Sequence, residues 1–278
     1  MKFDWYQASI PDVNPAVVMA ELAKSDYYGQ WVESRPTKGY DIGAQFVVGG
    51  DVLYRINHGG MNAEHGANVF GSGGSAPKLA QVIRENFPRH RVSRLDSCED
   101  FHHPDVYEYL RKKALKIAKE MKVQCREIVK PLPESDDGRT LYLGSQSSAV
   151  SMRIYEKGKQ LDCGTEWVRA ELQVRPQKDV KAVAAGLSPL EVWGIAKWSH
   201  AMAVQMGNSG LQRADVQIFQ KSDEERAKRF MLKQYGNTLR SMLATHGSWE
   251  TVGAQIGYDL DHINDEPEKP LITRLKNP

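Results

Sequence analysis

The sequence predicts an α+β protein in which an antiparallel sheet packs one apolar face on helices and is followed by a helical C-terminal region. Three observations predict this fold. Polar and apolar residues alternate in the middle of the chain, helix-start signals recur from Ser188 onward, and the composition is that of a globular protein. The 278 residues are 41% hydrophobic and 26% charged, which is enough to bury one large core or two small ones. The formal net charge of +2 excludes a histone-like binder, but it leaves room for a locally basic surface that binds nucleic acid.

Membrane and secretion signals are not found in the sequence. It has no apolar run of about 18 residues, and it starts without the basic and then apolar segments of a secretion signal. Its three cysteines lie tens of residues apart, without a CxxC pair. We therefore expect a cytoplasmic protein that does not associate with membranes and whose cysteines are reduced structural thiols.

The first 90 residues are predicted to form four strands and two helices. Three of the strands are expected at 3–10, 44–48 and 51–56. Gly49 and Gly50 separate the last two of these as a two-residue hairpin turn. Asn14 and Pro15 open the first helix, and Ser75 is predicted to cap the second.

Residues 90–175 are predicted to hold four more strands and one helix. The strands are expected at 90–96, 140–145, 150–157 and 166–175, with an exposed loop at 131–138. Asp105 is predicted to cap the helix, which is apolar on one side and rich in lysine on the other. A basic helix face is more often solvated than in contact with DNA, so solvation is the favoured interpretation.

The remainder of the chain is predicted to be helical. Capping boxes begin at Ser188 and Ser222, and a short helix begins at Ser248. We therefore expect an α+β domain at 1–186, a helical region at 187–266 that packs on it or extends it, and a flexible tail at 267–278. The segments around Gly247 loosely have the form of a helix-turn-helix, although core packing is the favoured interpretation.

Charged and polar side chains gather on one face of the predicted middle strands, because side chains alternate between the two faces of a sheet. In the last strand this face carries Trp167, Arg169, Glu171, Gln173 and Arg175. In the strand before it, the face carries Ser151, Arg153, Tyr155 and Lys157. The strand near residue 95 adds Arg94 and Asp96. Such a face is costly for structure alone, and it indicates a functional site if the strands pair in one sheet.

Two carboxylates on this face, Asp96 and Glu171, are candidate ligands of a divalent cation. Mg²⁺ and Mn²⁺ prefer oxygen ligands and often take only one or two protein carboxylates, with water and substrate phosphate completing the shell. Glu99 and Asp100 follow the first strand in a predicted loop that could bring either of them into the same site. Alternatively, Asp96 and Glu171 form ion pairs with neighbouring arginines, and the pattern leaves the two interpretations open.

Tyr155 is a candidate nucleophile. A phenol has a pKa near ~10, so it needs a metal, a cation or a base to attack at neutral pH. Arg153 and Lys157 would supply positive charge on the same face, and a phosphodiester is the natural target because cations stabilise the charge that develops on its oxygens. A tyrosine flanked by basic residues in a strand is, taken alone, more often a cross-strand packing residue.

Four motifs stand in order between residues 92 and 176. They are R-L-D within SRLDSCEDF, Y-L-G-S and R-I-Y-E-K within LYLGSQSSAVSMRIYEKGKQ, and R-x-E-L within WVRAELQVRP. In this order they resemble the replication initiation factor family, which comprises rolling-circle initiators of filamentous phages and of a class of Gram-positive plasmids. The resemblance covers about a third of the chain.

This resemblance implies a fold related to the HUH endonucleases, with an antiparallel sheet of ferredoxin-like halves. The sequence has no His-hydrophobe-His strand, so the two-histidine metal site of those enzymes is not carried over. The resemblance implies that Tyr155 is the nicking nucleophile and that Asp96 and Glu171 bind Mg²⁺ or Mn²⁺. Lys157 would assist at the phosphate. Residues expected to bind DNA are Arg94, Arg153, Arg169, Arg175 and Ser145.

The implied reaction is site-specific nicking of one DNA strand at an origin, single-stranded or supercoiled, through a 5′-phosphotyrosyl intermediate, followed by strand transfer. The implied setting is the cytoplasm of a bacterial host, with a host helicase and polymerase as partners, and a homodimer is compatible with it. Two alternatives stay open. One is a non-catalytic phage regulator that binds DNA or RNA on the same sheet face, and the other is a hydrolytic nuclease in which water attacks and Tyr155 is structural.

Overall fold

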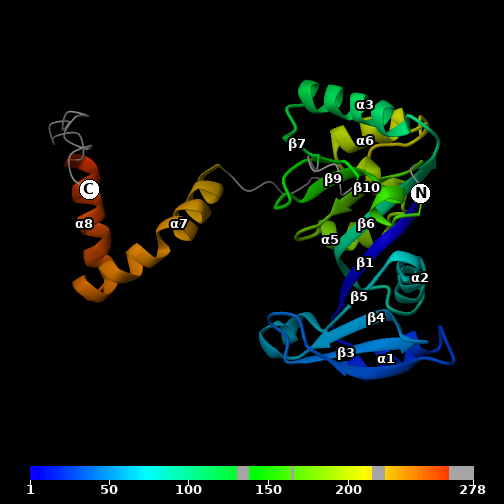
Figure 1. The fold of residues 1–278 in the computed structure, drawn as a ribbon. Helices are drawn as coiled ribbons and strands as arrows, with labels where there is room; N and C mark the ends of the chain where they lie inside the picture. Colours follow the sequence, from blue (N-terminus) through cyan, green and yellow to red (C-terminus); the bar gives the residue numbers. More distant parts are fainter. Residues whose placement is uncertain (130–137, 164–165, 215–222, 263–278) are drawn as a thin grey trace. The chain divides into compact units, whose positions relative to one another are not determined.

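The computed structural model describes residues 1–129, 138–163, 166–214 and 223–262 (Figure 1). The chain divides into two compact units, Met1–Phe219 and Gln220–Pro278. The first unit contains the sheet and the helices that pack on it, and the second contains two helices, α7 (Asp223–His246) and α8 (Trp249–His262). No helix among the described residues combines the length and the apolar character that a membrane span requires.

Ten described strands form one sheet in the order β2-β3-β4-β5-β1-β6-β10-β9-β8-β7. Every neighbouring pair is antiparallel, which confirms the predicted α+β class. The strands are β1 (Lys2–Ile10), β2 (Gln30–Ser34), β3 (Ile42–Val48), β4 (Asp51–His58), β5 (Ala67–Ser72), β6 (Arg91–His102), β7 (Cys125–Ile128), β8 (Thr140–Leu143), β9 (Val150–Glu156) and β10 (Trp167–Val174).

The described residues of the first unit also form six α-helices. They are α1 (Pro15–Ala23), α2 (Ala76–Asn86), α3 (Val106–Glu120), the single-turn α4 (Lys157–Gln160), α5 (Val180–Gly186) and α6 (Lys197–Gln205). Helix α2 contacts β1 and β5, α5 contacts β6, and α3 contacts β8, β9 and α6. Figure 1 shows α2 beside β1 and α3 next to α6. Leu95, Ile154 and Leu172 point into this core and are fully buried, as the alternation predicts.

The first 90 residues contain five strands, one more than predicted. The hairpin between β3 and β4 is confirmed, because Gly49 and Gly50 both have positive φ (58° and 94°), as a tight two-residue turn requires. Strand β2 is an edge strand whose side chains are mostly exposed, so it lacks the alternation that reveals a half-buried strand. No residue range was predicted for β2 or β5, and β7, at the opposite edge of the sheet, was not predicted.

Two predicted helix caps are wrong. Asp105 precedes α3 but has φ 63°, and its side chain makes no capping bond. The hydroxyl of Ser75 donates instead to the carbonyls of Leu53 and Ser72, both at 2.8 Å, and so ties α2 to β4. Ser75 is thus used by its tertiary surroundings rather than by the helix that follows, whereas the Asp105 side chain is exposed.

The capping box at Ser188 is present but does not start a long helix. The backbone N–H of Ser188 donates to Glu191 Oε2 at 2.7 Å, and the N–H of Glu191 donates to Ser188 Oγ at 3.3 Å. A 3₁₀ turn, Glu191–Gly194, follows, and α6 begins only at Lys197. Residues 212–214 pack closely against Gly194, where an added Cβ would lie 2.6 Å from the carbonyl oxygen of Gln212, and the N–H of Ala214 donates to the carbonyl of Gly194 at 3.1 Å.

Strand boundaries differ from the predictions at two places that matter for the site. Strand β6 continues to His102, so Glu99 and Asp100 belong to the strand and not to a loop. Strand β9 ends at Glu156, so Lys157 begins α4 instead of closing the strand. The predicted loop from residue 131, the cap at Ser222 and the tail at 267–278 lie outside the described residues.

Candidate active site

The pairing of β6, β10 and β9 brings the predicted site residues together on the polar face, which is the sheet face opposite the helix-packed core. Tyr155 lies opposite Arg169, and Arg153 lies opposite Glu171. Across the other edge of β10, Gln173 lies opposite Asp96. The residues that the alternation assigned to one face are therefore neighbours across β6, β10 and β9.

Tyr155 is hydrogen-bonded to Glu171 in the centre of this face. Its hydroxyl donates to Glu171 Oε2 at 3.2 Å. The same carboxylate accepts from Nη2 of Arg153 at 2.7 and 2.9 Å. Tyr155 is 5% exposed, and burial, followed by the negative charge of Glu171, raises the pKa of the phenol well above its ordinary value. The phenol is therefore neutral at physiological pH and next to a group that can accept its proton.

Asp96 is paired with an arginine of its own strand. Its Oδ1 accepts from Arg94 Nε at 2.9 Å, its Oδ2 accepts from Arg94 Nη2, and Gln173 Nε2 lies 3.4 Å from Oδ2. With the pair formed by Arg153 and Glu171, this means that ion pairs with neighbouring arginines are present at both candidate metal ligands.

The same two carboxylates nevertheless offer a donor set that fits a hard divalent cation. Asp96 and Glu171 lie on adjacent strands and are both almost fully buried. Burial raises the pKa of Glu171; the charge of Asp96 adds to this rise, and Arg153 opposes it. Two buried carboxylates that repel one another gain from a cation. The part of the chain that the structure describes has no group of three or more His, Cys, Asp or Glu placed to hold a metal ion, so water and phosphate would supply the remaining ligands.

Asp100 and Arg169 form a second charged cluster beside Tyr155. Arg169 donates to Asp100 through Nε at 2.7 Å and Nη2 at 2.9 Å, and to Asp4 through Nη1 at 2.8 Å. Trp167 Nε1 and Lys2 Nζ also bind Asp100, at 2.8 and 3.0 Å. Burial opposes ionisation of Asp100, but these donors outweigh it and hold the pKa of the carboxyl well below its usual range. Arg169, which we predicted to bind DNA, is thus committed to two carboxylates.

Three further predicted residues lie at the margins of this cluster. Lys157 Nζ is 5.6 Å from the centre of the Tyr155 ring, so it stays beside the phenol although it belongs to α4. Ser145 lies in the turn after β8, where its hydroxyl is 2.9 Å from that of Ser147. Arg175 follows β10, and its Nη1 donates to the carbonyl of Gln146 at 2.9 Å.

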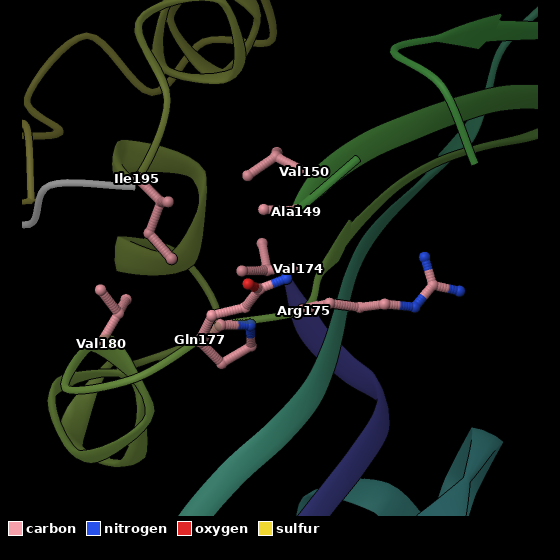
Figure 2. A pocket seen from close by; sticks show the side chains of 8 residues that line it. Ala149, Val150, Val174, Arg175, Gln177, Val180 and Ile195 are labelled. Carbon is pink, nitrogen blue, oxygen red and sulfur yellow. The ribbon is translucent and has the colours of Figure 1, made fainter. Parts of the chain in front are cut away.

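Figure 2 shows that the Arg175 side chain points away from an apolar hollow that Val180 and Ile195 help to line. With about 10 Å³ of space, this hollow has room for little more than one water molecule, so it is not a nucleotide pocket.

Comparison with known proteins identifies the segment that carries this site. The family model described as replication initiation factor matches residues 91–207. This segment belongs to the replication initiation factor family. It contains β6, β9 and β10, and with them Tyr155, Asp96 and Glu171.

A rolling circle replication initiator protein from Geobacillus stearothermophilus has a similar solved structure. The match has a TM-score of 0.55 at 18% sequence identity and covers 77% of this chain and 98% of that chain. At this identity the likeness concerns the fold, which extends beyond the replication initiation factor segment. No curated protein matches the chain.

Asp100 was expected in a loop that could bring it to the metal site, whereas in the structure it lies on β6 and pairs with Arg169. Asp100 is four residues after Asp96, so the same period-two alternation that grouped Arg94 with Asp96 also assigns it to the polar face once the strand is extended. Asp4, on β1, has no comparable signal, because its contact with Arg169 joins residues 165 positions apart.

Proposed function

We propose that this protein initiates rolling-circle DNA replication by nicking one strand at an origin, with Tyr155 as the nucleophile. The observation that carries the proposal is the hydrogen bond from Tyr155 to Glu171, flanked by Arg153 and Arg169, inside the replication initiation factor segment. The likeness of the fold to a rolling circle replication initiator supports the same conclusion.

In the proposed reaction, Oη of Tyr155 attacks a backbone phosphorus and the bond from phosphorus to the 3′-oxygen breaks. The phenolic proton passes to Glu171 Oε2, which is already its hydrogen-bond acceptor. The 3′-oxygen leaves and takes up a proton from water, and the 5′-phosphate stays on the tyrosine as an ester. The free 3′-hydroxyl can then prime synthesis, and a second transesterification would close the displaced strand.

Glu171 is suited to accept this proton because burial raises its pKa above that of an exposed glutamate. Asp96 and Glu171 would hold Mg²⁺ or Mn²⁺. When bound, the cation favours the ionised phenol and neutralises the charge that develops on the phosphate oxygens. Arg94 and Arg153 are partly exposed and pair with these carboxylates, and their remaining N–H groups would donate to DNA phosphates. Lys157 Nζ lies close enough to the Tyr155 ring to contact the DNA phosphate that Tyr155 would attack.

The DNA partner would be an origin. A host helicase would unwind the duplex there, and a host polymerase would extend the free 3′ end. Ser145 and Arg175, which lie at the margins of the site, would contact the DNA strand on the side of the β8–β9 turn. This setting places the reaction in the cytoplasm of a bacterial host.

The experiment that tests the proposal uses single-stranded DNA from the candidate origin of the genetic element that encodes this protein, labelled at its 3′ end. Wild type, Tyr155→Phe and Tyr142→Phe are incubated with it and Mg²⁺ or Mn²⁺ and run on denaturing gels. Tyr142 is a matched control, because it lies on the neighbouring strand opposite Arg153. We expect a metal-dependent covalent adduct with wild type and Tyr142→Phe and none with Tyr155→Phe.

Two results would contradict the nicking mechanism. Cleavage without an adduct that persists in Tyr155→Phe would indicate a hydrolytic nuclease in which water attacks. Binding of all origin fragments with neither cleavage nor adduct would indicate a regulator that only binds nucleic acid.

A further inference from the structure

Four side chains from four different strands form a continuous stack on the polar face. The guanidinium of Arg94 lies 4.2 Å from the ring centre of Trp5, and the rings of Trp5 and Phe70 are stacked at 5.3 Å with an interplanar angle of 12°. Arg55 lies at the other end, 6.0 Å from the centre of the Phe70 ring. We call Arg55, Phe70, Trp5 and Arg94 the aromatic column.

The aromatic column shares the sheet face with Tyr155 and Glu171. Trp5 lies opposite Asp96, and Gln7 lies opposite both Arg94 and Phe70. The residues that alternate with the column, Tyr6, Ile56 and Val69, are buried in the core on the other side of the sheet. The column therefore continues the candidate active site across β6, β1, β5 and β4.

The surface of the column combines flat apolar groups with positive charge. Trp5 and Phe70 are half-buried and Arg55 is exposed, so the outer end of the stack is accessible. No carboxylate among the described residues pairs with Arg55, which leaves its charge available to an anionic ligand. Next to the rings, Gln7 Nε2 donates to Asn68 Oδ1 at 2.9 Å, and Trp5 Nε1 donates to Gln7 Oε1 at 3.3 Å. Amide groups of this kind can exchange such bonds for bonds to the edges of bases.

We propose that the aromatic column binds unpaired bases of single-stranded DNA. Aromatic side chains on a sheet stack bases of any sequence, and guanidinium groups add attraction for both the ring faces and the phosphates. The loosely held Arg55 can move aside to admit a base against Phe70 or cover a base that stacks there. Two strands, β6 and β10, separate Trp5 from the strand of Tyr155, which corresponds to roughly 14 Å at the usual spacing of strands. The column would thus hold nucleotides a short distance from the nick, and to that extent the inference rests on the proposed function.

The test compares a thymidine oligonucleotide with an abasic oligonucleotide of the same length, which keeps the phosphates but offers no bases. Binding is measured by fluorescence anisotropy with Tyr155→Phe as the parent protein, so that no adduct can form. We expect the parent to prefer the thymidine oligonucleotide. Adding Trp5→Leu and Phe70→Leu should weaken binding of that oligonucleotide by at least about tenfold, while binding of the abasic one is unchanged.

The matched control replaces two tyrosines that form an exposed aromatic pair outside the sheet. Tyr27 and Tyr28 are 94% and 85% exposed, and their substitution by leucine in the same parent should leave the preference for bases intact. Equal affinity of the parent for both oligonucleotides would overturn the proposal. A folded double variant that keeps the preference, or one that loses affinity for both oligonucleotides equally, would also overturn it.

A second measurement needs no variant and covers the case in which the double substitution prevents folding. Ultraviolet crosslinking of the thymidine oligonucleotide to the parent protein, followed by mass spectrometry, should place crosslinks at Trp5 or Phe70, and crosslinks found solely elsewhere would refute the column. Failure of the column is distinguishable from failure of the nicking mechanism. A wild-type adduct without base preference refutes the column alone, and base preference without a wild-type adduct refutes the nicking alone.

Discussion

The hydroxyl of Tyr155 donates a 3.2 Å hydrogen bond to Glu171, a residue on the neighbouring strand whose carboxylate also binds Arg153. Direct hydrogen bonds thus join the neutral phenol of Tyr155 to the carboxylate that can accept its proton, and join that carboxylate to the guanidinium of Arg153. It makes the acceptor as important to the proposed chemistry as the nucleophile.

Replacing Glu171 by Gln should therefore lower the rate of adduct formation by at least about 100-fold, because the phenolic proton loses its acceptor. The rate is measured with single-stranded origin DNA on denaturing gels. Glu166→Gln is the control, since Glu166 is exposed at the start of β10, and it should react like wild type. Near-normal activity of a folded Glu171→Gln protein would remove Glu171 from the mechanism.

Asp96 should determine the affinity for the divalent cation. Chelation with EDTA is expected to abolish adduct formation by wild type, and Asp96→Asn should raise the Mg²⁺ concentration for half-maximal rate by at least about tenfold, because the variant loses a charged oxygen ligand. Mn²⁺ binding followed by electron paramagnetic resonance gives a readout that does not depend on activity. Asp51→Asn, an exposed substitution in the β3–β4 hairpin, should not change either value. Unaltered Mn²⁺ affinity in Asp96→Asn would show that Asp96 acts only as the partner of Arg94.

Asp100 should make the stability of the fold depend on pH. The folded-state pKa of Asp100 lies below the ordinary value of 3.8. Its contribution to the free energy of unfolding is therefore fully present above pH 3.8 and is lost as the pH falls from there toward the folded-state pKa. We expect Asp100→Asn to lower the free energy of unfolding by about 3 kcal/mol at pH 7, because Arg169 loses two hydrogen bonds to a charged partner.

Urea unfolding between pH 3 and pH 7 measures this effect. The difference between wild type and Asp100→Asn should shrink toward the acid end, whereas Asp51→Asn should follow wild type throughout. A difference that stays constant with pH would mean that Asp100 stabilises the fold through its shape rather than its charge.

Ser97 should hold the segment after residue 188 against the sheet. Its hydroxyl accepts a 3.0 Å hydrogen bond from the indole of Trp193 and donates one of 2.7 Å to the carbonyl of Pro189. Trp193 is completely buried, so Ser97→Ala leaves an unpaired donor in the core and should cost about 1–3 kcal/mol of stability. Thermal unfolding checks this value. Ser93→Ala, on the same strand and with one weak 3.4 Å bond, should cost less, and equal losses would refute the role of Ser97.

Local patterns in the sequence predicted those features that depend on a few consecutive residues. The period-two alternation assigned Arg153, Tyr155 and Glu171 to one face, and the Gly49-Gly50 pair located the hairpin between β3 and β4. These predictions held because the direction of a side chain on a strand and the geometry of a tight turn are determined by the backbone next to them.

The same local signals failed at two predicted helix caps. Asp and Ser are residue types that often cap helices, but neither Asp105 nor Ser75 caps its helix with its side chain, and Ser75 bonds across to β4. Among the strands for which no residue range was predicted, β2 and β7 lie at the edges of the sheet, and neither has a buried face with a strict alternation.

By itself, therefore, the sequence determined which side chains share a face of the sheet and which segment carries the family motifs. Only the tertiary structure decided which of them touch: that Glu171 accepts from Tyr155, that Asp96 is held by Arg94, and that Trp5 stacks on Phe70, 65 positions further along the chain. The reason is physical. The register between strands that are distant in the sequence depends on which faces are buried together in the folded chain, whereas a local turn specifies it only for hairpins such as β3–β4.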